Sequence, residues 1–186
     1  MDFNGKIQKL KKAINEADSI MVGAGAGLST SAGMLYSGET FETNFGDFIK
    51  KYHFTDLYTA GFHDFKDPQE YWSFWSRFIH YERYTMPPKP VYNNVYKLVK
   101  DKNYFVITTN VDHFFQRSGF DKKRLFYTQG DYGLLQCKKP CHKKNYDNEE
   151  IIEKMFKEQN NMKVPKELIP SCPKCRGPMI PNLRGG

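Results

Sequence analysis

The chain has 186 residues, of which 39% are hydrophobic and 16% aromatic, so its composition excludes a disordered protein and allows a folded core. We find no apolar stretch near the roughly 20 residues that cross a bilayer and no secretion signal in the first residues, so we expect a cytoplasmic protein without a membrane span. The formal net charge is +7, but the lysines are scattered, which favours a solvated surface or attraction for an anionic cofactor over nucleic-acid binding.

The N-terminal part predicts a helix, a strand and a glycine-rich turn. Apolar residues at helical spacing predict an amphipathic helix over 5–17, and the apolar run 19–22 predicts a buried strand. Glycines recur over 23–33, and we expect the hydroxyl of Ser29 or Thr30 to cap a short helix that begins there. A strand that leads into glycines and a helix is typical of a phosphate-binding turn. The strict G-x-G-x-x-G spacing fails, because the sixth position from Gly25 is Thr30, so a tight turn without a ligand is the alternative.

Residues 35–86 form an aromatic-rich segment without a strand pattern. Pro68 is typical of a helix N-terminus, and a helix is predicted over 69–83. We therefore interpret the segment as a helical insertion beside a sheet and expect most of its aromatic side chains to be core.

Two further strands are predicted, over 104–108 and 124–127, with helices over 91–99 and 113–118. The first leads to Asn110 and Asp112, and the second leads to Gln129 and Gly130. Strands separated by helices predict an α/β fold with a parallel sheet, in which ligands bind at the carboxyl ends of the strands. We expect the glycine turn, Asn110, Asp112 and Gln129 to converge there, although Asn110 and Asp112 could also serve as helix N-caps.

The cysteines form two close pairs, Cys137 with Cys141 and Cys172 with Cys175, separated by a segment with a charged helix over 148–160. In a cytoplasmic chain, such pairs are typical of a zinc ribbon, and four thiolates would saturate a structural Zn²⁺ ion and leave no position for catalysis. The alternatives are a redox Cys-x2-Cys pair, which leaves the first pair unexplained, and a ligand set in which His142 replaces one thiolate.

The order of these motifs resembles the sirtuin family, whose members are NAD-dependent enzymes with a Rossmann-like domain and a small domain of helical and zinc-binding insertions. The resemblance rests on Gly25-Ala-Gly-Leu-Ser29, Thr-Thr-Asn110-Val-Asp112, Gln129-Gly130 and the four cysteines. It implies a Rossmann-like domain over 1–34 and 87–131, a helical insertion over 35–86 and a zinc-binding module over 132–183. Sirtuins usually continue beyond the second cysteine pair, so we expect the C-terminal part of the fold to be absent from this chain. We therefore expect weak NAD affinity, an open sheet edge near the chain's end and a tendency to associate.

Two departures from the usual pattern resemble class M sirtuins, the bacterial macrodomain-associated branch. Gln129 stands where most members have a histidine, and Tyr36-Ser-Gly-Glu39 follows the glycine turn. The runs 70–77 and 129–133 match the same branch. The resemblance implies a protein mono-ADP-ribosyltransferase that acts on a lipoyl-carrier protein related to the glycine-cleavage H protein, with a macrodomain hydrolase as a further candidate partner.

The resemblance also assigns the site residues. Asn110 would orient the ribose of NAD, Asp112 would hold the nicotinamide carboxamide and Gln129 would contact the ribose, and these three are the expected catalytic residues. Tyr36 would shield the reacting sugar. The remaining residues expected to bind NAD lie in the glycine turn: Gly25, Ala26, Gly27, Ser29, Thr30 and Gly33.

The replacement of histidine by Gln129 bears on the reaction. Deacylation of lysine needs a base that removes a proton from a ribose hydroxyl, and a glutamine amide cannot accept that proton. Loss of such a base costs about 100- to 10,000-fold, so we expect deacylation to be nearly lost, whereas transfer of ADP-ribose to an ionised acceptor survives. The alternatives are an inert Gln129, His113 as a displaced base, a lysine deacylase, or a non-catalytic binding module stabilised by zinc.

Overall fold

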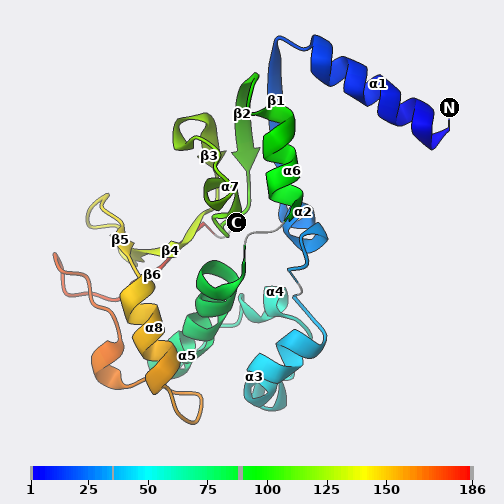
Figure 1. The fold of residues 1–186 in the computed structure, drawn as a ribbon. Coiled ribbons are helices and arrows are strands. Elements are labelled where there is room, and N and C mark those ends of the chain that lie inside the picture. The colour runs from blue at the N-terminus through cyan, green and yellow to red at the C-terminus, as the bar shows by residue number, and fades with distance from the viewer. Residues whose placement is uncertain (1, 35, 88–89, 185–186) are drawn as a thin grey trace. The chain divides into compact units, whose positions relative to one another are not determined.

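The computed structural model describes residues 2–34, 36–87 and 90–184, and the chain divides into two compact units (Figure 1). Unit 1 comprises residues 1–32, 88–110 and 114–128. Unit 2 comprises residues 33–87, 111–113 and 129–186. The chain therefore passes between the units several times, and two of these passages lie next to Asn110 and Gln129.

Unit 1 contains the parallel sheet that the sequence predicts, and its strands lie in the order β1-β2-β3. Its strands are β1 (Ser19–Ala24), β2 (Asn103–Thr108) and β3 (Leu125–Tyr127). Its helices are α1 (Phe3–Glu16), α2 (Ala26–Ser31), α6 (Pro90–Val99), α7 (Phe114–Arg117) and the 3-10 turn η2 (Lys122–Arg124). On one side of the sheet, Tyr92 of α6 packs against the rings of Phe114 and Phe115, so aromatic side chains fill this part of the core.

The start of α2 differs from the prediction. The helix begins at Ala26, and Gly25, in an extended conformation, is the N-cap without a side-chain hydrogen bond. The expected cap by Ser29 or Thr30 is therefore wrong. Both hydroxyls lie inside the helix, where Thr30 donates to the carbonyl oxygen of Ala26 and Ser29 is buried.

The other face of the sheet in unit 1 is apolar and exposed. Met21 lies beside Phe105, and Ile107 lies beside Phe126, in neighbouring strands. Their exposed fractions are 72%, 39%, 37% and 54% for Met21, Phe105, Ile107 and Phe126. Parallel sheets are normally covered on both faces, so this face is a candidate for self-association.

We expect this chain to bind a hydrophobic dye and to elute at a concentration-dependent size. Replacement of Phe105 and Phe126 by Lys should reduce both effects, because the charges interrupt the apolar face. Size-exclusion chromatography with light scattering measures the change, with Phe62→Lys, another exposed aromatic residue, as the control. Equal association of all three proteins would contradict the assignment of this face.

Unit 2 combines helices with a small antiparallel sheet in the order β5-β4-β6. Its strands are β4 (Gly130–Cys137), β5 (Tyr146–Asp147) and β6 (Met179–Leu183). Its helices are α3 (Glu39–Tyr52), α4 (Leu57–Ala60), α5 (Pro68–Ile79), the π-helix η1 (His80–Thr85), α8 (Glu149–Glu158) and the 3-10 turn η3 (Lys166–Leu168). The last strand, β6, lies at an edge of its sheet, which agrees with the expected open edge near the chain's end.

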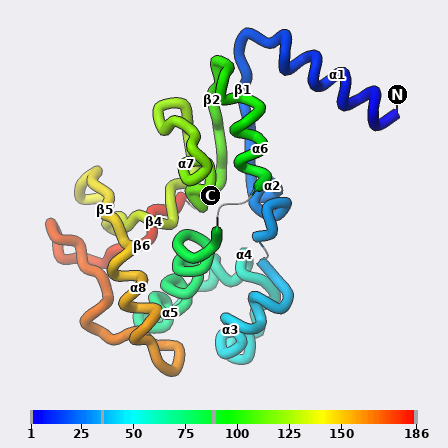
Figure 2. Tube along the Cα trace, in the orientation of Figure 1, coloured from blue at the N-terminus to red at the C-terminus, as the bar shows by residue number. Residues whose placement is uncertain are grey.

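The aromatic residues of the insertion form the core of unit 2, as predicted. Phe45, Phe48 and Phe74 are buried and in mutual ring contact. Helices α5 and α8 pack side by side (Figure 2), and Ser73 donates to Gln159 at 2.7 Å. Bilayer-spanning helices are not found among the described residues, since none of the helices there combines sufficient length with apolar character.

Candidate active site and metal centre

The glycine turn lies at the carboxyl end of β1, where a parallel sheet binds ligands. Gly25 is extended, and a Cβ there would lie 3.3 Å from the hydroxyl oxygen of Thr109. A Cβ on Gly27 would meet nothing within 4 Å, so a ligand could approach the backbone closely at this position. The first N–H groups of a helix have no partner within it, so the turn at Gly25, Ala26 and Gly27 is suited to an anionic group.

Asn110 follows β2 and lies in a buried hydrogen-bond network within unit 1. Its side-chain amide donates to the hydroxyl oxygen of Ser29 at 3.0 Å and to that of Tyr92 at 3.1 Å. The two hydroxyl groups are 2.9 Å apart and also bond to each other. The network fixes the orientation of the Asn110 amide.

The network also includes Ser29, one of the residues expected to bind NAD. Its hydroxyl is buried and bonds to Tyr92 and Asn110, so Ser29 contacts the proposed ribose-binding residue, and its own binding of NAD stays a prediction. The sequence analysis did not single out Tyr92, because an aromatic residue on the apolar face of a helix looks like ordinary core.

Asp112 and His113 belong to a short segment of unit 2, and Asp112 is buried. The carbonyl oxygen of Val111, just before them, accepts a hydrogen bond from the N–H of Tyr132 at 3.0 Å. The Nδ1 atom of His113 lies 2.5 Å from a carboxylate oxygen of Asp131. The segment after Asn110 is therefore attached to the beginning of β4.

Gln129 is exposed in the turn that precedes β4, and Gly130 fixes this turn. The Gln129 carbonyl oxygen accepts from the N–H of Arg184 at 3.0 Å. Gly130 has φ +98°, and a Cβ there would lie 1.9 Å from the carbonyl oxygen of Asn182. Only glycine fits between the turn and β6. The contact with β6 therefore fixes the backbone from which the Gln129 side chain projects.

We expect Gly130→Ala to destabilise the protein by about 3 kcal/mol or more, because a side chain there both clashes with the backbone and requires a left-handed conformation. Gly46→Ala is the control, since a Cβ at this position in α3 meets nothing within 4 Å. That substitution should stabilise the helix by about 0.5–1 kcal/mol. Urea unfolding of both variants measures the difference, and equal stability would contradict the tight packing at Gly130.

The remaining expected NAD-binding residues lie in unit 2. Gly33 has φ +87°, which a glycine adopts readily, and it turns the chain after α2. Tyr36 is partly buried against the aromatic core, and its carbonyl oxygen accepts from the N–H of Leu57 at 2.7 Å. Asn110 belongs to unit 1, whereas Asp112 and Gln129 belong to unit 2, so the convergence of these side chains stays a prediction.

The four cysteines lie together, as predicted, in a geometry that fits one metal ion. All four sulfur atoms of Cys137, Cys141, Cys172 and Cys175 lie within 4.8 Å of one another. The sulfur atoms of Cys137 and Cys175 are 3.6 Å apart, and those of Cys141 and Cys172 are 3.7 Å apart. A tetrahedral ion with metal–sulfur bonds of about 2.3 Å requires sulfur atoms about 3.8 Å apart. The cluster can therefore bind a metal ion through four thiolates.

The surroundings of Cys172 favour a thiolate, whereas burial and the neighbouring cysteines raise the pKa of the Cys141 thiol. The backbone N–H of Cys175 lowers the pKa of the Cys172 thiol, as does that of Lys174, although burial acts in the opposite direction. The Nδ1 atom of His142 lies 3.0 Å from the sulfur of Cys141, and its Nε2 atom lies 2.9 Å from the Tyr146 hydroxyl. His142 thus contacts a cysteine that already belongs to a complete set of four, which favours a supporting role over that of a ligand.

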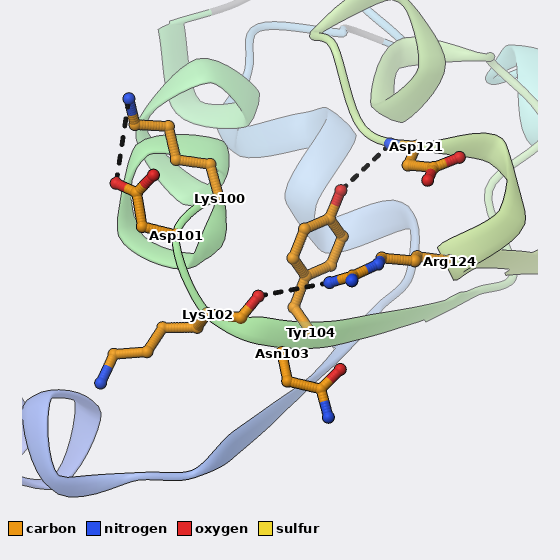
Figure 3. A pocket seen from close by; sticks show the side chains of 7 residues that line it. All are labelled: Lys100, Asp101, Lys102, Asn103, Tyr104, Asp121 and Arg124. Carbon is orange, nitrogen blue, oxygen red and sulfur yellow. Dashed lines mark hydrogen bonds and ion pairs between the residues drawn. The ribbon is translucent and has the colours of Figure 1, made fainter.

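A separate open cavity of about 570 Å³ lies at the opposite end of β2, in unit 1 (Figure 3). Residues 100–104, Asp121 and Arg124 line it. Its charged groups already have partners: Lys102 donates to the carbonyl oxygen of Asn15 at 2.7 Å, and Arg124 donates to that of Lys102 at 3.3 Å. Because parallel sheets bind ligands at the carboxyl ends of their strands, this cavity is not the candidate active site.

The parallel sheet with its glycine turn, together with the helical insertion and the four-cysteine module, defines a Rossmann-like fold with a metal-binding module. Residues 25–184 match the Sir2 family, so the chain belongs to this family. Solved sirtuin structures have the same fold. One, from a study of the mechanism and regulation of Sir2 enzymes, gives a TM-score of 0.61 at 22% identity and covers 98% of this chain. Another, a mutant Sir2 homologue in complex with ADP-ribose, gives a TM-score of 0.60 at 18% identity and covers 98% of this chain.

Two curated relatives are similar in sequence. A protein ADP-ribosyltransferase of Staphylococcus aureus is 45% identical over 175 residues, which are 94% of this chain and 56% of the relative. A probable bifunctional ADP-ribose hydrolase/ADP-ribosyltransferase of Fusarium oxysporum is 32% identical over 142 residues, 74% of this chain and 23% of that protein. The chain thus spans about half of the first relative, and it covers 65% and 63% of the two solved structures.

Proposed function

We propose that this chain is part of a sirtuin-like protein mono-ADP-ribosyltransferase that transfers ADP-ribose from NAD to a lipoyl-carrier protein related to the glycine-cleavage H protein. The observation that carries the proposal is the amide side chain of Gln129, which stands where the family resemblance expects a histidine base, in a turn that Gly130 fixes. The Staphylococcus aureus relative, named a protein ADP-ribosyltransferase, supports the same reaction.

In this reaction, a nucleophile of the acceptor replaces nicotinamide at C1′ of the ribose, and nicotinamide leaves with the electron pair of the broken bond. The backbone at Ala26 and Gly27 would bind the diphosphate, because both residues are exposed at the start of a helix and a Cβ on Gly27 would meet nothing within 4 Å. Asn110 would orient the ribose, and Asp112 would hold the nicotinamide carboxamide. Gln129 would hydrogen-bond the ribose without removing a proton.

The absence of a base at position 129 favours an acceptor that is already ionised. A carboxylate is deprotonated near neutral pH and needs no proton transfer before it attacks. A lysine deacylase needs that transfer, so Gln129 argues against deacylation. We propose a structural Zn²⁺ ion in the four-cysteine cluster, with no part in the transfer, because four thiolates leave no open coordination position.

A macrodomain hydrolase that removes the modification is the further partner that we propose. The name of the Fusarium oxysporum relative couples ADP-ribose hydrolysis with ADP-ribosyl transfer in one protein. In this chain, the matched residues belong to the Sir2 family, so the hydrolase would be a separate protein or domain.

The test incubates labelled NAD with a lipoylated carrier protein, the same carrier without lipoate, and an acetyl-lysine peptide. We would use the 186-residue chain and a chimera that adds the C-terminal part of the Staphylococcus aureus relative. Labelling of a carrier with release of nicotinamide supports the proposal, and the comparison of the two carriers shows whether lipoate is required. Calorimetry with NAD should show weaker binding to the chain than to the chimera.

Two results would contradict the proposal. Deacetylation of the peptide without labelling of a carrier would establish a deacylase. A chimera that binds neither NAD nor a carrier, combined with salt-sensitive binding of the chain to nucleic acid, would favour a non-catalytic module.

A further inference from the structure

A group of three charged or titratable side chains surrounds a buried carboxylate at the beginning of β4, next to the segment that follows Asn110. The Asp131 carboxylate is its centre. One of its oxygens accepts from Arg83 Nε at 3.1 Å and from the N–H of Gly133 at 2.7 Å. The other lies 2.5 Å from His113 Nδ1. We call His113, Asp131 and Arg83 the His113 cluster.

Asp131 is ionised and fully engaged in this group. Its side chain is 6% exposed. Burial alone would raise the pKa of the carboxyl group, but the hydrogen bond and charge of His113, with Arg83 and the Gly133 N–H, lower it below its usual value. A buried carboxylate with three donors holds those donors firmly, because each loses a charged partner if the group separates.

The backbone of His113 has an unusual conformation. Its φ is +67°, in the left-handed region that residues other than glycine seldom adopt. Asn, Asp and His are the residue types most often found there after glycine. Such conformations persist where the surrounding contacts enforce them, and they are common at functional sites. Here the ring of His113 bonds to Asp131, a contact that favours this conformation.

Arg83 is fixed in turn by its element and by Gly133. It lies in η1, a π-helical turn directly after α5, and π-helical turns are often found at functional sites. A Cβ on Gly133 would lie 2.9 Å from the Nε atom of Arg83, so the guanidinium lies against a backbone without a side chain. Two segments of unit 2, η1 and β4, therefore determine the position of Arg83.

We propose that His113 is a positioning residue for the ADP-ribosyl transfer: its Nδ1 bond to Asp131 holds Asp112 and Gln129 in fixed relation to each other. Asp112 directly precedes His113, and Gln129 lies two residues before Asp131, so the bond joins the two segments that carry the proposed nicotinamide and ribose contacts. The backbone bond between Tyr132 and Val111 runs between the same segments. The inference rests on the proposed function, which assigns the nicotinamide contact to Asp112 and the ribose contact to Gln129.

This role differs from that of a displaced base. With Nδ1 donating to Asp131, the neutral ring carries its lone pair on Nε2, and a base would have to use that atom. A positioning role needs the Nδ1 donor alone. The two roles can therefore be separated by a side chain that keeps a donor at the place of Nδ1 and lacks Nε2.

Asparagine is such a side chain, because its amide nitrogen occupies nearly the place of Nδ1 and its backbone tolerates positive φ. We expect His113→Ala to reduce the rate constant of transfer by about 100-fold, the effect of a misplacement of about 1 Å. His113→Asn should retain most of the rate and the same dependence on pH between 6 and 8. His53→Ala is the matched control, since His53 is exposed and also has a left-handed backbone, at the end of α3.

Two results would overturn the inference. One is a His113→Asn variant as slow as His113→Ala, with loss of the acidic limb of the pH profile, which would make His113 a base. The other is a His113→Ala variant with unchanged rate. Nuclear magnetic resonance supplies a readout that does not depend on activity: the amide signals of Asp112 and Gln129 should shift in His113→Ala and return in His113→Asn. Unshifted signals overturn the inference even if the protein transfers nothing, whereas failure of the unsubstituted protein to modify any acceptor contradicts the proposed function alone.

Discussion

Removal of metal from the four-cysteine cluster is expected to unfold the part of unit 2 that contains β4, β5 and β6. Cys137 ends β4, and Cys172 is buried beside the turn that leads to β6, so the ion would join the end of β4 to the segment that begins β6, at one end of this sheet. Binding of Zn²⁺ to four thiolates supplies on the order of 10 kcal/mol in small zinc-dependent domains, which is comparable with the whole stability of a domain. A strong chelator should therefore abolish the cooperative thermal transition of unit 2.

The measurements are metal analysis, which should give one Zn²⁺ ion per chain, and thermal unfolding with and without chelator. Cys172→Ser should reproduce the effect of the chelator, and Ser171→Ala, the neighbouring substitution at an exposed position, should not. His142→Ala should retain the ion, because the four sulfur atoms already form a tetrahedral set. Four freely titrating thiols in a protein whose unfolding is unaffected by chelator would contradict a structural metal ion.

Much of the fold could be predicted because its elements depend on short-range patterns. The strand β2 is a short apolar run, and the apolar residues of α6 recur at helical spacing. The clustering of the cysteines could also be predicted, because thiols three or four residues apart in a turn can reach one ion. The start of α2 could not be predicted in the same way. Sequence rules predict that hydroxyl side chains serve as helix N-caps. Here Gly25, with an extended backbone, is the N-cap, and the Ser29 hydroxyl bonds to Tyr92 and Asn110 instead.

The contacts that support the candidate site depend on tertiary structure. His113 and Asp131 are 18 residues apart, and Arg83 and Asp131 are 48 apart, with no local pattern that joins them. Arg83 also depends on the change from α-helix to π-helix after Ile79, where the sequence predicts one continuous helix to 83. The sequence identified side chains of the expected chemical types, but the residues that hold them in place appear in the structure alone.

Replacement of Asn110 is the substitution from which we expect the largest loss of activity. Asn110→Ala should reduce ADP-ribosyl transfer by at least about 100-fold, because an unoriented ribose seldom reaches the reactive arrangement. Its effect on stability should be small, about 1 kcal/mol, because the hydroxyls of Ser29 and Tyr92 bond to each other at 2.9 Å and stay paired without the amide. Transfer kinetics and urea unfolding, measured on the same variant, separate these two effects.

The network of Asn110 allows a graded version of this test. Tyr92→Phe keeps the ring in the core but removes one acceptor of the Asn110 amide, so transfer should fall less than in Asn110→Ala. Ser29→Ala removes the other acceptor and should act similarly, since the Ser29 hydroxyl also accepts a hydrogen bond from the Asn110 amide. Asn103→Ala, at the opposite end of β2, is the matched control and should leave transfer unchanged. If Ser29→Ala weakened NAD binding and Tyr92→Phe had no effect, Ser29 would be a direct ligand of the dinucleotide, and the proposed support of Asn110 by the two hydroxyls would be wrong.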